Sequence, residues 1–155
     1  MNIPYTNFKT RIVGTWQDLD TETIFNDKKI IVFSLPGAFT PTCSAKHLPG
    51  FVMATDKLKE KDIKKVICIS INDPFVMDAW GKAHNVNNKI LMVGDSNGDF
   101  TKNIGAEVNL VKRGLGIRSS RYTMLVENSR IIKVFEEDVP GKCEITSAEN
   151  FLKEI

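Results

Sequence analysis

Short β-branched runs alternate with segments of helical periodicity through much of the chain. Residues 29–35, 66–71 and 89–93 have the length and composition of buried strands. Between them, residues 45–59 and 75–83 carry apolar side chains at helical spacing, apart from one Pro-Gly pair that should kink the first of these helices. This alternation predicts an α/β fold built from β-α-β units.

The end of the chain follows a different order. Residues 122–127 and 131–135 are strand candidates joined by Asn128-Ser129, which indicates a hairpin. Ser147 is placed to cap a last helix over residues 148–155. A β-α-β block followed by a hairpin and a helix is the order of the thioredoxin fold. We therefore expect a thioredoxin-like α/β fold with a central mixed β-sheet flanked by helices on both faces.

Length, charge and cysteine content narrow the class of protein. The chain has 155 residues, which suits one domain over 1–155, and its net charge of +2 does not favour binding to nucleic acid or membranes. No apolar run approaches the roughly 20 residues that span a bilayer, and the first residues lack a secretory pattern. The three cysteines are too few for a disulfide scaffold, so we expect a cytoplasmic protein whose cysteines are buried or catalytic.

Cys43 lies in the turn Pro36-Gly-Ala-Phe-Thr40-Pro-Thr-Cys43-Ser, at the predicted start of a helix. A helix N-terminus offers free N–H groups and the positive end of the helix dipole, and both stabilise a thiolate. Thr40 adds a hydroxyl three residues before the sulfur, and Gly37 lets backbone approach closely. The alternative is a buried structural cysteine. A turn with two prolines, two threonines and a glycine is a poor place for one, which favours a reactive thiol.

This turn and several later segments resemble the peroxiredoxins, above all their type II, or Prx5, branch. Pro36, Thr40 and Cys43 match the family pattern Pro-x-x-x-Thr-x-x-Cys, and the match continues through His47-Leu-Pro-Gly-Phe51. Further segments follow in the family's order: Cys68-Ile-Ser-Ile-Asn-Asp-Pro-Phe-Val-Met77, Trp80-Gly-Lys-Ala-His84 and Gly114-Leu-Gly-Ile-Arg118-Ser-Ser-Arg121-Tyr. Several motifs in one order make a strong signal.

The resemblance implies an antioxidant thiol peroxidase acting on hydrogen peroxide and small alkyl hydroperoxides. Cys43 would attack the distal peroxide oxygen and become a sulfenic acid. Thr40 would hydrogen-bond the peroxide, and Arg121 would stabilise the thiolate and the charge that develops on the cleaved O–O bond. The remaining substrate-binding residues would be Pro36, Gly37 and Thr42.

Other chemistries fit the residues less well. His47 shares a helix face with Cys43, as in a protease-like Cys–His pair, but no orienting Asn or Asp has a motif around it. We expect His47 to make a structural hydrogen bond instead. A thioredoxin-type exchange enzyme needs Cys-x-x-Cys, and Thr40 occupies the first position. A non-enzymatic module would need neither Thr40 nor Arg121. The Cys and His spacing does not suit a metal site, and no cofactor is expected.

The route by which the sulfenic acid returns to thiol stays open. Cys143, in a loop expected to be exposed, is a candidate resolving cysteine because its neighbourhood resembles the place where some relatives keep one. Alternatively, an external reductant attacks the sulfenic acid directly: glutathione with glutaredoxin, or thioredoxin. Cys68 lies in a predicted strand and is expected to be a buried core residue. The resemblance also implies a homodimer.

Overall fold

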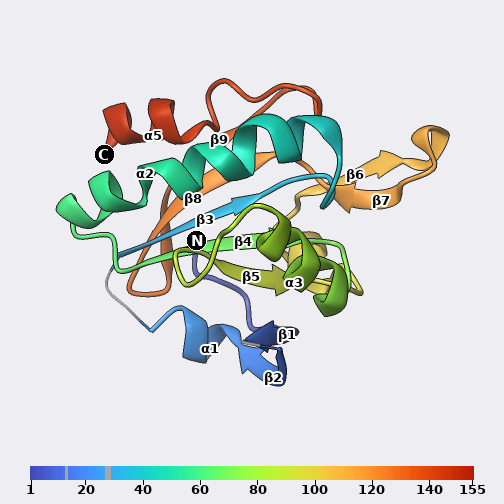
Figure 1. Ribbon diagram of the computed structural model, residues 1–155, viewed down its shortest axis with the longest axis horizontal. Helices are drawn as coiled ribbons and strands as arrows, with labels where there is room; N and C mark the ends of the chain where they lie inside the picture. Colours follow the sequence, from blue (N-terminus) through green and yellow to red (C-terminus); the bar gives the residue numbers. More distant parts are fainter. Residues whose placement is uncertain (13, 27–28) are drawn as a thin grey trace.

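A seven-stranded mixed sheet runs through the centre of the computed structural model, which describes residues 1–12, 14–26 and 29–155 (Figure 1). The strand order is β2-β1-β5-β4-β3-β8-β9. Three parallel strands form its middle: β3 (Lys29–Ser34), β4 (Lys65–Ser70) and β5 (Leu91–Gly94). Two antiparallel strands continue it beside β3: β8 (Tyr122–Glu127) and β9 (Arg130–Glu136).

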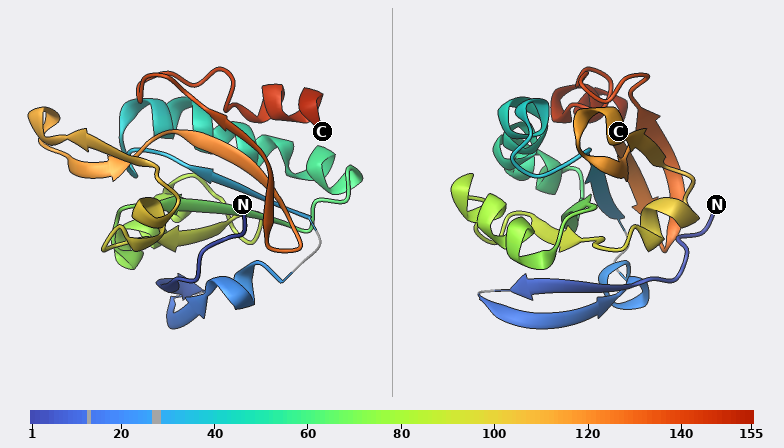
Figure 2. Two further views of the ribbon diagram at one scale, coloured as in Figure 1. Left: turned by 180° about the vertical axis from the view of Figure 1, so that it is seen from behind. Right: turned by 90° about the vertical axis from the view of Figure 1, so that its right-hand side faces the viewer.

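Helices cover both faces of the sheet, as predicted (Figure 2). The helices on one face are α2 (Leu48–Glu60), α3 (Pro74–Ala83) and α5 (Ala148–Glu154), and those on the other are the short α1 (Thr21–Ile24) and α4 (Asp99–Asn103). Alternate residues of β3 divide between the two cores, Phe33 on the first side and Val32 on the second. Both are fully buried, and burial on both faces is why residues 30–33 of this strand are all apolar. None of the helices in the described ranges is long and apolar enough to cross a membrane.

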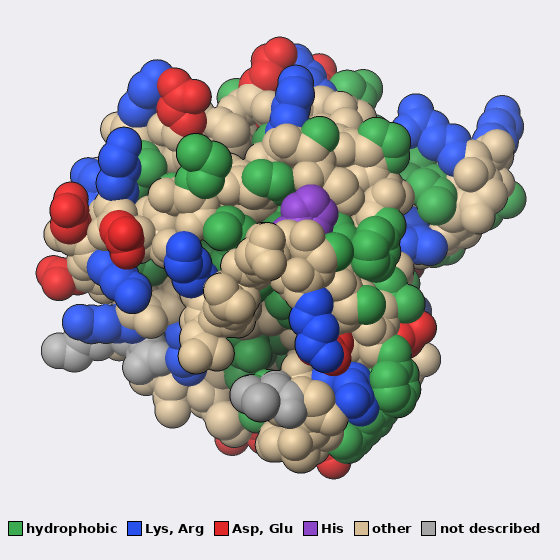
Figure 3. Space-filling view, viewed as in Figure 1, with side chains coloured by type: hydrophobic (Ala, Val, Ile, Leu, Met, Phe, Trp, Pro, Cys, Tyr) green, Lys and Arg blue, Asp and Glu red, His purple; other side chains and the backbone are tan. Residues whose placement is uncertain are grey.

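Two hairpins lie outside the predicted pattern. β1 (Asn7–Ile12) and β2 (Thr15–Asp20) pair antiparallel at the edge of the main sheet, where every residue of β2 is exposed or only partly buried. β6 (Glu107–Leu110) and β7 (Gly116–Ser119) form a separate two-stranded sheet that projects from the body of the molecule (Figures 1 and 2). Basic side chains gather at its tip (Figure 3), where Lys112 and Arg113 are exposed.

The sequence predicts a kink at Pro49-Gly50. The structure has a π-helical segment, η1 (Cys43–His47), directly before α2, and α2 itself begins at Leu48 and includes both residues. The backbone N–H of Leu48 reaches back to the carbonyl of Cys43, one residue farther than in an α-helix. Pro49 lacks an N–H and its ring crowds the preceding turn, so a wider turn accommodates it. The wide turn therefore includes Cys43 itself.

Candidate active site

Cys43 lies in the first turn of the helical segment that follows β3. Pro41 and Thr42 are already helical, and the N–H of Ser44 donates to the carbonyl of Thr40 at 2.9 Å. In a helix that begins here, the N–H groups of Thr42 and Cys43 have no carbonyl one turn before them. The residue Cys43 itself is completely buried. The structure thus places a buried sulfur at the donor-rich end of a helix.

Arg121 reaches Cys43 because β8 pairs with β3. Ser34 at the end of β3 lies opposite Tyr122, so the preceding Arg121 falls beside the loop that carries the cysteine. Its Nη2 atom lies 3.1 Å from the Sγ of Cys43, and its Nε and Nη2 atoms donate to the carbonyl of Pro140 at 3.2 and 3.0 Å. Arg121 is only 1% exposed. Its guanidinium is therefore a buried cation aimed at the sulfur.

His47 fixes the other side of the guanidinium. Its Nδ1 atom lies 3.0 Å from Nη1 of Arg121, and its Nε2 atom lies 3.2 Å from Oγ1 of Thr123. Because the Thr123 hydroxyl donates to the carbonyl of Thr146 at 2.7 Å, it accepts from Nε2–H, which leaves Nδ1 free to accept from Arg121. Burial, and then the charge of Arg121, hold the pKa of His47 well below its usual value, so the imidazole is neutral. The structural hydrogen bond expected for His47 is present, and the residue also orients Arg121.

The loop between β3 and the helix places the residues predicted to bind substrate. The hydroxyl of Thr40 donates to the carbonyl of Gly37 at 2.6 Å. Arg118 donates from Nη1 to the carbonyl of Pro36 at 3.2 Å. A Cβ atom on Gly37 would lie 2.7 Å from the same Nη1 atom. Glycine is therefore required there for the close approach of Arg118, a contact that no local pattern reveals.

Cys143 belongs to the strap, by which we mean residues 138–146 between β9 and α5. The strap lies against the active site, because the Thr42 hydroxyl donates to the carbonyl of Gly141 at 2.9 Å. Contrary to the sequence expectation, Cys143 is half-buried rather than exposed, and the Thr146 hydroxyl lies 3.7 Å from its sulfur. Burial raises the pKa of the Cys143 thiol. The strap is packed and hydrogen-bonded, which is why its cysteine is partly covered.

Cys68 is a core residue, as expected. It lies in β4 directly opposite Phe33 of β3 and is completely buried. Burial, and then the neighbouring Cys43, raise the pKa of its thiol well above the usual value. A thiol in this state is a poor nucleophile.

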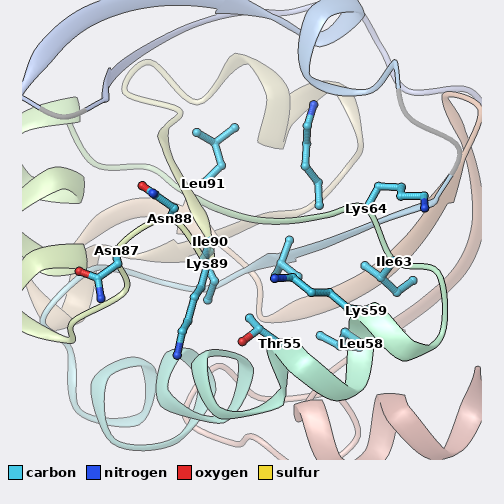
Figure 4. A pocket seen from close by; sticks show the side chains of 12 residues that line it. Thr55, Leu58, Lys59, Ile63, Lys64, Asn87, Asn88, Lys89, Ile90 and Leu91 are labelled. Atoms are coloured by element: carbon cyan, nitrogen blue, oxygen red, sulfur yellow. The ribbon is translucent and has the colours of Figure 1, made fainter.

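A separate pocket of about 470 Å³ opens at the opposite edge of the sheet, by the N-terminal ends of β4 and β5 (Figure 4). Figure 4 shows the side chains of Lys59 and Lys89 on either side of Thr55. None of the residues that line this pocket is a cysteine or belongs to the surroundings of Cys43. Within the described ranges, no cluster of three His, Cys, Asp or Glu side chains suits a metal ion.

Comparison with known proteins assigns the family. The Redoxin family model matches residues 4–152. Peroxiredoxin-2D of Arabidopsis thaliana is 44% identical over 137 residues, which cover 88% of this chain and 84% of the relative. Reduced Prx3 of Vibrio vulnificus, solved in complex with hydrogen peroxide, superposes with a TM-score of 0.92 and 36% identity over 99% of this chain and 96% of its own. Peroxiredoxin 5 of Alvinella pompejana gives a TM-score of 0.84 and 32% identity over 99% and 94% of the two chains. The chain belongs to the redoxin family as a peroxiredoxin of the type II branch, a thiol-dependent peroxidase.

Proposed function

We propose that Cys43 is the cysteine that reacts with peroxide, as a thiolate paired with Arg121. The observation that carries this proposal is the buried guanidinium. Its other acceptors, the carbonyl of Pro140 and the neutral imidazole of His47, bear no charge. A buried cation without a counter-ion is unfavourable by several kcal/mol, and a thiolate 3.1 Å away supplies that counter-ion.

Thr40 and the helix start would position the two peroxide oxygens. The Thr40 hydroxyl gives its own proton to Gly37, so its oxygen is an acceptor for the O–H of a hydroperoxide. The N–H groups of Thr42 and Cys43, together with Arg121, are donors for the oxygen that leaves. The thiolate then attacks the oxygen that bears hydrogen. An S–O bond forms, the O–O bond breaks, and the leaving alkoxide or hydroxide takes a proton from solvent, which yields a sulfenic acid and an alcohol or water.

We infer that the substrates are hydrogen peroxide and small alkyl hydroperoxides. Cys43 is completely buried and Pro36 and Gly37 beside it are buried as well, which favours small substrates. The Vibrio vulnificus relative, solved with hydrogen peroxide bound, supports the first of these.

Cys143 is proposed to resolve the sulfenic acid. Its strap supplies the carbonyls of Pro140 and Gly141 to Arg121 and Thr42, so Cys143 is two residues from a direct contact with the active-site helix. The Cys143 thiolate attacks the Cys43 sulfur, an S–S bond forms, the S–O bond breaks, and hydroxide leaves to become water. An external reductant, thioredoxin or glutathione with glutaredoxin, would then reduce the disulfide. The competing route is direct attack of that thiol on Cys43.

One experiment separates these proposals. Peroxide consumption is measured for the wild type and for Cys43→Ser, Cys143→Ser and Cys68→Ser, with glutaredoxin/glutathione and with thioredoxin offered separately. Cys43→Ser abolishes turnover; full activity in that variant excludes Cys43 as the reactive residue. In the wild type we expect a Cys43–Cys143 disulfide after one equivalent of peroxide, and Cys143→Ser should not form it. An adduct of the external thiol on Cys43 that is the same in wild type and Cys143→Ser contradicts internal resolution.

A homodimer is proposed on the face that carries Trp16 and Phe75. Both aromatic side chains are about half exposed, their ring centroids are 5.7 Å apart, and the guanidinium of Arg11 lies 4.7 Å from the Phe75 ring. Exposed aromatic clusters of this kind favour association. Sedimentation velocity of Phe75→Glu should show monomers, and the control Met53→Glu, on the exposed side of α2, should not. We also propose a reducing compartment, such as the cytoplasm, because three cysteines are too few for a disulfide scaffold.

A further inference from the structure

A buried carboxylate, Glu137, lies at the end of β9 where the strap begins. Its Oε2 atom accepts hydrogen bonds from the backbone N–H of Glu144 at 2.9 Å, and from the N–H and hydroxyl of Thr146, both at 2.8 Å. Lys142, the cation on the strap, pairs with Asp138 and Glu144 at 3.7 and 3.5 Å. Desolvation of a carboxylate is unfavourable, so the three hydrogen bonds must offset it. The carboxylate is a structural acceptor for the strap.

These hydrogen bonds close the strap into a loop that faces Arg121. The carbonyl of Pro140, inside that loop, accepts from two nitrogen atoms of the guanidinium. The backbone N–H of Glu137 donates to the carbonyl of Arg121 at 3.0 Å. Glu137 therefore connects to Arg121 in two ways, through its own backbone and through the loop that its side chain holds closed.

Thr146 extends the connection to the imidazole. Its carbonyl accepts from the Thr123 hydroxyl, which accepts from His47, and His47 in turn accepts from Nη1 of Arg121. The two neutral acceptors of the guanidinium thus both depend on a segment bound to Glu137. A free arginine side chain populates many rotamers, and these acceptors select the one that reaches the sulfur.

We propose that Glu137 is a positioning residue for peroxide reduction. It holds the strap against Arg121 and so keeps the guanidinium 3.1 Å from the Sγ of Cys43. A carboxylate suits this task because it accepts hydrogen bonds and donates none. Its charge also strengthens each hydrogen bond that it accepts. An amide in its place would make weaker bonds and would loosen the strap.

The test is a double-mutant cycle between Glu137→Ala and Arg121→Gln. The measured quantity is the rate of Cys43 oxidation in a single turnover with hydrogen peroxide, followed by tryptophan fluorescence. Of the two tryptophans, Trp80 is the reporter, because its Nε1–H donates at 3.0 Å to the hydroxyl of Ser44, the residue after Cys43. Misplacement of a catalytic group lowers rates by up to about a hundredfold, so Glu137→Ala should slow the wild type by roughly tenfold to a hundredfold. In the Arg121→Gln background it should have no further effect. An equal loss in both backgrounds contradicts the proposal.

Two further variants keep the test decisive. Glu149→Gln removes the same charge from an exposed residue in the first turn of α5, outside the strap, and should leave the rate unchanged. Glu137→Gln preserves the shape of the side chain and serves if Glu137→Ala does not fold, as judged by circular dichroism. Glu137→Gln should slow the oxidation of Cys43. It should also shift the NMR signal of the Arg121 Nε–H, which in the wild type donates to the carbonyl of Pro140. A folded Glu137→Gln protein with the wild-type rate and an unshifted signal shows that Glu137 has no positioning role.

Discussion

The Nη2 atom of Arg121 lies 3.1 Å from the Sγ of Cys43 although the two residues are far apart in the chain. The pairing of β8 with β3 produces this contact, and Pro140 and His47 hold the guanidinium in its orientation. A charged donor that is already in place stabilises both a thiolate and the charge on a leaving oxygen without reorganisation during the reaction.

Replacing Arg121 should therefore have a large effect on rate. We expect Arg121→Gln to lower the rate constant for peroxide reduction by about a hundredfold to a thousandfold, the range found when a preorganised donor is removed. Stopped-flow kinetics with hydrogen peroxide measures it. Arg113→Gln, which removes an exposed arginine from the β6–β7 hairpin, is the matched control and should retain the wild-type rate.

Thr40 should matter through its hydroxyl oxygen. Thr40→Val keeps the shape of the side chain but loses both the hydrogen bond to Gly37 and the acceptor for the peroxide. A hydrogen bond between neutral groups contributes about 0.5–1.5 kcal/mol, so kcat/KM should fall by roughly twofold to tenfold. Thr40→Ser restores the oxygen and should recover most of the activity. Equal kcat/KM values for the Val and Ser variants would show that the hydroxyl takes no part.

His47 should make stability depend on pH. The pKa of His47 in the folded protein lies well below the unfolded value of 6.5. Below about pH 6.5 the unfolded chain therefore binds a proton at His47 that the folded protein does not bind. The free energy of unfolding should then fall by up to about 1.4 kcal/mol per pH unit as the solution is acidified. Urea unfolding at several pH values measures this slope. His47→Gln should reduce it, and a slope equal to that of the wild type in this variant refutes the assignment.

Two glycines should respond differently to alanine. A Cβ atom on Gly94 would lie 2.6 Å from the backbone oxygen of Asn72, which cannot move alone, so Gly94→Ala should destabilise the protein by about 1–3 kcal/mol. On Gly37 the close atom is the mobile end of Arg118. Gly37→Ala should therefore be less destabilising, while it displaces Arg118 from the carbonyl of Pro36. Urea denaturation compares the two, and the reverse order of stabilities would contradict this account.

The central sheet and the last helix were predictable because their signals are local. The strands over 29–35, 66–71 and 122–127 are rich in apolar residues, and Ser147 caps α5 by accepting from the N–H of Asn150. The edge strand β2 was missed because its sequence, Thr-Trp-Gln-Asp-Leu-Asp, has few inward-facing apolar residues. Its structure depends on pairing with β1, which the sequence of β2 alone does not encode.

The residues of the active site also divide into those that a local sequence pattern predicts and those that it does not. Cys43 and Thr40 stand out because a Pro/Thr turn before a helix is a local pattern. The role of His47 depends on Thr123, which the fold brings from a distant segment, and that of Glu137 depends on the loop that returns to it at Thr146. Such hydrogen bonds follow from strand register and from the path of a loop, so the spacing of residues in the sequence does not predict them.

The strap contributes to the active site mainly through main-chain oxygens. The carbonyls of Pro140, Gly141 and Thr146 accept the hydrogen bonds from Arg121, Thr42 and Thr123. Every residue type has a carbonyl, so substitutions at most strap positions would leave this scaffold intact. Evolution could then gain or lose a cysteine such as Cys143 without disturbing the surroundings of the buried sulfur. The route by which the oxidised cysteine is reduced again could then differ between relatives while the reaction with peroxide stayed the same.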